Sequence, residues 1–523
     1  MSDQEKPGAA APEAAVEPEA GATSASGEET RAAETSPAET GPAETGPAET
    51  GPAETGPAET SAKFVTGDLR RHVLTMSAAG SVGLMAIFLV DLADLFFISL
   101  LGQAELAAAV GYAASILFFT MSVGIGLAIA VGALVSRAIG AGEAERARLW
   151  ATHAFAAAMG VSLVVGGAVW LAAEPLIALV GARGETARLA VGYLSIVAPS
   201  LPLTAAMMCA GAVLRAHGDA KRSMTTTIVA ALVNGVLDPI FIFAFAMGLD
   251  GAAWATVASR AAGAAVGLWP IIALYGGFSV LRRAAFGADL RAIFAIAGPA
   301  MATNVATPIG AAYLTRLMSE YGDAAVAGYA IVGRLTPVAF GFVFALSGAI
   351  GPIVGQNYGA GHLGRVRETM TETLKIVGVF TLGVSVLLFA LSGWIVAAFG
   401  AEGDAALLVY WFCGPLSLLF FFNGVLFATN AAFNNLGRPF LSTLLNWGRH
   451  TLGAIPPALL GAALLGPPGV LLGQALGGVA FAALALWRAY RLIDEHEAGA
   501  TAVEPGPRLA WRWPLWPFST LKD

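Results

Sequence analysis

The chain has 523 residues, of which 56% are hydrophobic and only 12% are charged, and its mean hydropathy is +0.70. Soluble domains carry roughly a quarter charged residues, so this composition excludes an ordinary soluble protein and indicates a polytopic membrane protein. The formal net charge is −7, but Asp3 and twelve Glu outweigh Lys6 and Arg31 in residues 1–62 and make that segment −11, which leaves +4 for the rest. No nucleic-acid partner is expected.

Residues 1–62 are an acidic, low-complexity tail in which the unit PAETG repeats from Pro37 to Ser61. The tail has no aromatic residue and cannot bury enough apolar surface to offset its ordering entropy, which predicts disorder. A solvated spacer is the favoured interpretation, and a binding tail is the alternative. The first 60 residues also lack the apolar core of a secretory signal.

Twelve apolar segments follow, each long enough to cross a bilayer, for which about 20 residues suffice. The sequence therefore predicts an all-α polytopic membrane protein with two six-helix lobes, residues 63–280 and 281–495, and a cytoplasmic tail of residues 496–523. The predicted segments are centred near residues 87, 121, 161, 200, 236, 263, 305, 340, 384, 419, 453 and 480.

Alternate loops differ in charge. One set is rich in Arg and Lys, as in "GAGEAERAR" and "RAHGDAKRS", whereas the other leans acidic, with Glu105, Asp250, Glu320, Asp323 and Glu402. Because cytoplasmic loops carry the excess of cations, both termini are expected on the cytoplasmic side of a bacterial inner membrane. An even number of helices agrees with that orientation.

The chain also repeats itself. "GALVSRAIGAGEAERAR" (132–148) matches "GPIVGQNYGAGHLGRVR" (351–367) at an offset of 219, and the same offset relates "RAHGDAKRS" to "NNLGRPFLS". An even number of helices separates the copies, so the two halves share one orientation in the membrane. Parallel repeats of this kind are typical of transporters with a binding site near the bilayer midplane.

Acidic groups inside apolar segments are costly, about 2.5–3.5 kcal/mol on insertion scales, and mark functional sites. The first segment carries Asp91 and Asp94, and the fifth carries Asn234 and Asp238, which share one helical face because they are four residues apart. Pro239 removes a backbone donor and weakens the helix around this pair. A buried carboxyl is driven towards its neutral form, so it can gain and lose a proton or bind a cation.

A purely structural role for Asp238 is the alternative, as a hydrogen-bond partner of Thr256 or Arg260. Arg260 and Arg334 lie in apolar segments and each needs an anionic or carbonyl partner. The second half carries only neutral polar groups in its core segments, among them Asn304 and Asn423. The ionisable chemistry is therefore expected in the first lobe.

Aromatic residues such as Phe97 and Tyr112 are candidates for an apolar substrate pocket, although plain packing is the favoured interpretation. The two cysteines, Cys209 and Cys413, lack the spacing of a metal site or a disulfide framework. No metal and no cofactor other than a coupling ion is expected.

Residues 70–495 resemble the multidrug and toxic compound extrusion (MATE) transporters of the oligosaccharidyl-lipid and polysaccharide exporter superfamily. The resemblance rests on the order and spacing of "ADLFFISLLGQAELAAAV", "LVSRAIGAG", "LRAHGDAKRSM", "NGVLDPIFIF", "GAAWAT" and "GQNYGAG". It implies twelve helices in two lobes that rock between inward and outward openings and exchange substrate for H⁺ or Na⁺.

The DinF-like branch of that family, with its cation site in the first lobe, is the most similar. The resemblance places its site on Asp94, Asn234, Asp238 and Thr256, with Asp91 as a neighbour, and leaves Arg260, Arg334, Asn304 and Asn423 as candidates for the substrate cavity with Phe97 and Tyr112. The family's bending proline in the first helix is replaced by Ala79 beside Gly80, and Arg260 stands where Gln is more usual. These differences favour proton over sodium coupling.

The resulting hypothesis is a secondary active efflux transporter that works as a monomer among membrane lipids and exports small organic substrates, lipophilic cations above all, against H⁺ or Na⁺. A lipid-linked saccharide flippase of the same superfamily is the alternative. An intramembrane enzyme is disfavoured because no "HExxH" or "GxSxG" occurs, and the duplicated halves argue against a passive channel.

Overall fold

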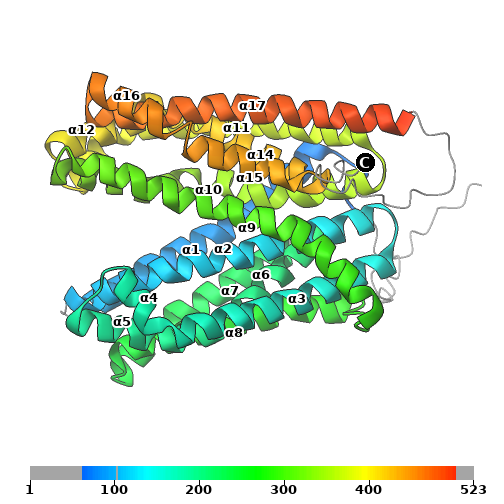
Figure 1. Ribbon diagram of the computed structural model, residues 1–523, viewed down its shortest axis with the longest axis horizontal. Helices are drawn as coiled ribbons and strands as arrows, with labels where there is room; N and C mark the ends of the chain where they lie inside the picture. Colours follow the sequence, from blue (N-terminus) through cyan, green and yellow to red (C-terminus); the bar gives the residue numbers. More distant parts are fainter. Residues whose placement is uncertain (1–61, 102–103, 502–523) are drawn as a thin grey trace, which may run out of the picture. The chain divides into compact units, whose positions relative to one another are not determined.

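The computed structural model describes residues 62–101 and 104–501 (Figure 1). Within these ranges the regular structure is helical throughout, as the apolar segments predict. The predicted disorder of the acidic tail concerns residues outside those ranges, apart from Ala62, and so does most of the predicted C-terminal tail.

The first repeat begins with three long helices and then alternates long and short ones. Its elements are α1 (Leu69–Ser99), α2 (Ala104–Gly140), α3 (Ala144–Leu171), α4 (Ala173–Leu179), α5 (Gly184–Val197), the 3₁₀ turn η1 (Ala198–Ser200), α6 (Leu201–Ala216), α7 (Ala220–Pro239), the π-helical turn η2 (Ile240–Ala244) and α8 (Gly248–Leu274). We call this part the N-lobe.

The second repeat, the C-lobe, follows a connection of eight residues. Its elements are α9 (Arg283–Ser319), α10 (Asp323–Gly359), α11 (Leu363–Ala398), α12 (Gly403–Trp411), the π-helical turn η3 (Phe412–Leu416), α13 (Ser417–Leu419), α14 (Phe421–Asn435), α15 (Pro439–His450), α16 (Ile455–Leu465) and α17 (Pro467–Thr501). The predicted lobe boundary at residue 280 lies in the connection, and its role as a boundary of moving bodies stays a prediction.

Ten helices in the described ranges are long and apolar enough to span a bilayer, and α12–α13 with α14 form an eleventh span bent by 43°. The twelfth predicted segment, near residue 453, is α15 and α16, which are separated by the turn at residues 451–454. The protein is therefore a multi-pass membrane protein, and every predicted segment corresponds to a helix or a broken helix.

Hydrogen bonds confirm the internal repeat at an offset of 219 residues. Ser223 Oγ at the start of α7 donates to the carbonyl of Gly211 at 3.2 Å, and Ser442 Oγ at the start of α15 donates to the carbonyl of Asn430 at 3.4 Å. The copies differ beyond this point, because α7 runs to Pro239 whereas its counterpart breaks after His450.

The two lobes meet along α1, α2, α9 and α10, which lie between the outer helices of each lobe in Figure 1. One apolar cluster joins Phe64, Leu69 and Met76 to Ile353 of the C-lobe. These residues lie towards the end of the bundle formed by the loops 141–143, 217–219, 360–362 and 436–438. Arg and Lys residues lie in or directly beside these loops, and we call this the basic end. At the opposite end, the buried residues of each apolar cluster belong to one lobe only. Ile98 and Tyr193 share a cluster in the N-lobe, and Leu314 and Leu408 share one in the C-lobe.

Candidate functional site

Two carboxyl groups and one amide meet inside the N-lobe. Asn234 on α7 donates through Nδ2 to Asp94 Oδ1 of α1 at 3.0 Å and to Asp238 Oδ2 at 2.8 Å. Asp238 is 0% exposed, Asn234 is 6% exposed and Asp94 is half-buried. The structure thus brings together the three residues that the sequence singled out most strongly.

Local sequence explains this arrangement. The i, i+4 spacing puts Asn234 and Asp238 on the same face of α7, and α1 packs against α7 along its length. Helix α7 ends at Pro239, which lacks a backbone N–H, and the chain continues into the π-helical turn η2. Asp238 therefore lies where the regular helix ends.

The carboxyl groups of Asp94 and Asp238 lie close together, because both accept from the same Asn234 Nδ2 atom, at 3.0 and 2.8 Å. Two ionised carboxylates that share one amide donor repel each other, whereas a proton on one of them lets that carboxyl donate to the other. Asp238 Oδ1 is buried and has no hydrogen-bond donor in the described part of the chain. The pair can accordingly accept a proton, or a cation between its oxygens.

Over the described ranges, the structure gives no hydrogen bond between this pair and the predicted cation-site residues Thr256 and Asp91, nor between the pair and the substrate-cavity candidate Arg260. Thr256 Oγ1 donates to the carbonyl of Ala252 in its own helix at 3.0 Å. Arg260 donates to Ser200 Oγ at 2.7 Å and to the Val197 carbonyl at 3.3 Å. The alternative in which Asp238 bonds to Thr256 or Arg260 is therefore wrong for this conformation. Asp91 is exposed on α1.

The predicted substrate residues are scattered over both lobes. Phe97 packs edge-on against Phe243, with ring centroids 6.4 Å apart. Phe97 and Tyr112 also pack against the N-lobe cluster that contains Ile98, so both fit plain packing. Arg334 is exposed on α10. In the C-lobe, Asn304 donates to its own helix at Ala300 and Asn423 accepts a bond from Arg449.

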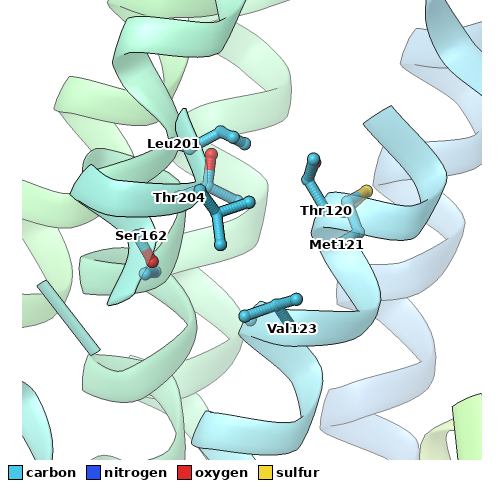
Figure 2. A pocket seen from close by; sticks show the side chains of 9 residues that line it. Thr120, Met121, Val123, Ser162, Leu201 and Thr204 are labelled. Atoms are coloured by element: carbon cyan, nitrogen blue, oxygen red, sulfur yellow. The ribbon is translucent and has the colours of Figure 1, made fainter. Parts of the chain in front are cut away.

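A small pocket opens in the N-lobe between α2, α3 and α6. Figure 2 shows Thr120, Met121 and Val123 of α2 facing Ser162 of α3 and Leu201 and Thr204 of α6. The hydroxyl of Thr204 is buried without a partner among the described residues. The pocket mixes apolar walls with hydroxyl groups, but it is far too small for a drug-sized molecule.

Two hydrogen bonds join the lobes at the basic end, and their donors occupy equivalent positions of the repeat. Arg137 of α2 donates to the carbonyl of Asn434, near the end of α14. Gln356 of α10, at the position equivalent to Arg137, donates through Nε2 to the carbonyl of Ala216 at 2.7 Å, at the end of α6. Each lobe thus satisfies a terminal helix carbonyl of the other.

The same helices cross at glycines. A Cβ at Gly140 would clash with the Gln356 carbonyl, and a Cβ at the equivalent Gly359 would clash with the Arg137 carbonyl. The segment before α1 adds to the contact, since Phe64 is 1% exposed and its N–H donates to Gln356 Oε1 at 2.8 Å. We call these contacts the closed gate.

The loop between α6 and α7, beside the closed gate, has its own polar network. Burial alone would raise the pKa of Asp219, but hydrogen bonds from Arg222 and from the Tyr275 hydroxyl outweigh it and lower that pKa below its usual value. Burial, together with the bond to Asp219, raises the pKa of Tyr275 to about 12. Asp219 also caps α7 by accepting the Arg222 N–H at 3.1 Å, so the loop holds α7 in place.

Sequence reasoning missed the gate residues and Arg449. Arg137 lies three residues before the basic loop "GAGEAERAR", yet it is only 5% exposed. Arg449 follows the basic loop at Arg438 by eleven residues, in a stretch from 405 to 493 that has no Asp or Glu. An arginine that far inside an apolar segment is the signal that would have found it.

The sequence model of the MatE family matches residues 81–240 and 299–459, one block in each lobe. The chain belongs to the MatE family. Each matched block covers most of one copy of the repeat described above, and the first block contains Asp94, Asn234 and Asp238.

Individual proteins support this assignment to MatE. A protein of Shewanella oneidensis named FAD transporter is 28% identical over 452 residues, which cover 83% of this chain and 97% of the relative. The multidrug export protein MepA of Staphylococcus aureus (strain MSSA476) is 24% identical over 328 residues, or 62% of this chain and 72% of MepA. A crystal structure of the Vibrio cholerae MATE transporter VcmN in its bent form superimposes with a TM-score of 0.78 at 24% identity, covering 82% and 98% of the two chains. The structural likeness to VcmN shows a shared fold. The names of these three proteins are those of transporters or of an export protein.

Proposed function

We propose that this protein is a secondary active exporter that antiports organic substrates against H⁺ or Na⁺ by alternating access. The observation that carries the proposal is that Asp94 and Asp238 both accept from the side-chain amide of Asn234. A buried pair of acids that changes its charge with one ion is a suitable coupling switch, provided that the ion binds the two conformations with different affinity.

The closed gate supports the direction of transport. If the basic end faces the cytoplasm, as the distribution of Arg and Lys implies, the described conformation is closed to the cytoplasm and separated at the outer end. Both termini are then cytoplasmic in a bacterial inner membrane. An ion arriving from outside reaches the Asp94–Asp238 pair in this state, and substrate leaves before the lobes rock inward.

Two substrate classes follow from the relatives. Lipophilic cations are the first, because MepA is named a multidrug export protein and the N-lobe acids can attract cations. A phosphate-bearing nucleotide is the second, because the relative named FAD transporter matches over 97% of its own length. The flippase alternative requires an anionic lipid headgroup, which the N-lobe acids do not favour. A functional monomer remains part of the proposal.

The test is proton release from everted vesicles loaded by respiration. Addition of a lipophilic cationic dye is expected to release protons or to depend on Na⁺, and Asp238→Asn is expected to abolish this coupling, because an amide cannot exchange a proton. Asp250→Asn is the matched control, since Asp250 is exposed in the first turn of α8. Coupled export at the normal rate by Asp238→Asn would refute the assignment of the coupling site.

A further inference from the structure

Four polar residues connect α14 and α15 in the middle of the C-lobe. Arg449 Nη2 donates to Asn423 Oδ1, and one helical turn nearer the basic end Asn446 Nδ2 donates to Asn430 Oδ1 at 3.0 Å. We call Asn423, Asn430, Asn446 and Arg449 the polar seam. The seam ends where α15 stops at His450 and the chain turns before α16.

The charge of Arg449 is unbalanced. Residues 405–493 contain no Asp or Glu, and none of the ion pairs in the described ranges involves Arg449. A guanidinium has five N–H donors, and its hydrogen bond in the described part of the chain is the one to Asn423. No nitrogen of Arg449 is both sealed from solvent and unpaired, and the residue as a whole is half-buried.

The internal repeat shows that the fold does not need this cation. At the offset of 219 residues, the seam corresponds to Thr204, Gly211, Thr227 and Ala230 in the N-lobe. The N-lobe packs the same two helices with small and hydroxyl side chains. In the N-lobe, the counterpart of Arg449 is Ala230, which lies four residues and thus one helical turn before Asn234 on α7.

We propose that the polar seam binds the phosphate or pyrophosphate group of an organic substrate, with Arg449 as its counter-ion. This proposal rests on the proposed function, since it names the substrate class of the exporter. The planar guanidinium presents paired N–H donors that match phosphate oxygens, and an anion supplies the negative charge that residues 405–493 lack.

The opposite polarity of the lobes separates the two ligands. The acids of the N-lobe take the coupling cation, whereas Arg449 takes the oxyanion, so the ion and the substrate do not compete for the same side chains. A pyrophosphate group occurs both in soluble dinucleotides such as FAD and in lipid-linked sugars. The seam recognises what these share, and experiment separates the two sources.

Binding is measured on the purified full-length protein in nanodiscs, at fixed pH and without an ion gradient. FAD binding is followed by flavin fluorescence, and inorganic pyrophosphate and a prenyl pyrophosphate in the nanodisc serve as competitors. Arg449→Gln is expected to weaken FAD binding about 10- to 150-fold, the range for loss of a hydrogen bond to a charged group. Arg449→Lys retains the charge without the fork and is expected to fall in between.

Arg316→Gln is the matched control, because Arg316 is exposed in the last turn of α9, and it is expected to bind FAD as the unmodified chain does. Competition by inorganic pyrophosphate indicates a soluble substrate, and competition by the prenyl pyrophosphate alone indicates a lipid-linked one. Either result supports phosphate binding by the polar seam if the competition is weakened in Arg449→Gln.

The inference is overturned if Arg449→Gln and the unmodified chain bind all three probes equally, or if no probe binds. Where Arg449→Gln fails to fold, Arg449→Lys replaces it and is expected to bind FAD more weakly than the unmodified chain, so that equal binding overturns the inference. The proposed function fails separately, through normal ion coupling in Asp238→Asn, because the binding assay uses no gradient.

Discussion

At the scale of single residues, the N-lobe site depends on one amide. Asn234 is 6% exposed, and its NH₂ group serves both Asp94 and Asp238. An amide can donate to either protonation state of a neighbouring carboxyl, because the carboxyl keeps acceptor oxygens in both. Asn234 therefore holds the acids together while their charge changes.

Replacement of this amide gives the residue-scale prediction. Asn234→Ala removes two hydrogen bonds to acidic groups, each worth about 1.5–3 kcal/mol when its partner is charged, so coupled dye export in everted vesicles is expected to fall about tenfold or more. Thr315→Ala provides the comparison, because the exposed Thr315 hydroxyl bonds only to Ala311 of its own helix among the described residues. Equal export by the two variants would show that the amide has no part in coupling.

At the scale of helices, the closed gate depends on the crossing of α2 and α10. Gly140 and Gly359 let the backbones touch, which no side chain with a Cβ allows at these positions. The lock of Arg137 on Asn434 and of Gln356 on Ala216 requires the same close approach. Small residues at helix contacts are a general device in membranes.

Gly359→Val is expected to open the gate, because the new side chain overlaps the Arg137 carbonyl. The measurement is maleimide labelling of Ala349→Cys, a position that is 1% exposed between the lobes, in a chain whose two native cysteines are replaced by Ala. Labelling from the basic end should become severalfold faster. Gly364→Val is the control, since a Cβ there meets no atom within 4 Å; equal acceleration by both variants would contradict the prediction.

At the scale of the described bundle, the two lobes form a quasi-symmetric pair that is joined at one end. Ser136 and Gly355 are equivalent in the repeat and face each other, and a Cβ at residue 355 would lie 2.9 Å from the Ser136 Cβ. Alternating access requires that such contacts separate during every cycle. A covalent link between them should stop the cycle.

The double variant Ser136→Cys with Gly355→Cys tests this in the same cysteine-free background. A disulfide needs a Cβ–Cβ distance of about 3.5–4.5 Å, so the helices must separate by about 1 Å to form it. Export is expected to be lost on oxidation and restored by a reducing agent, whereas each single variant should be insensitive to both. Undiminished export by the oxidised, cross-linked protein would contradict rocking of the lobes about this gate.

The sequence by itself determined the helical class, the twelve segments, the parallel repeat and the shared helical face of Asn234 and Asp238. Each of these depends on local composition or on spacing along the chain. A span needs apolar length, the repeat shows a constant offset, and Asn234 and Asp238 are spaced four residues apart. Only the tertiary structure decided which neighbours these groups meet. Arg260 bonds to Ser200 and not to an acid, Arg137 closes the gate, and Arg449 lies unbalanced in the C-lobe, because contacts between helices far apart in the chain depend on packing, which a spacing pattern does not encode.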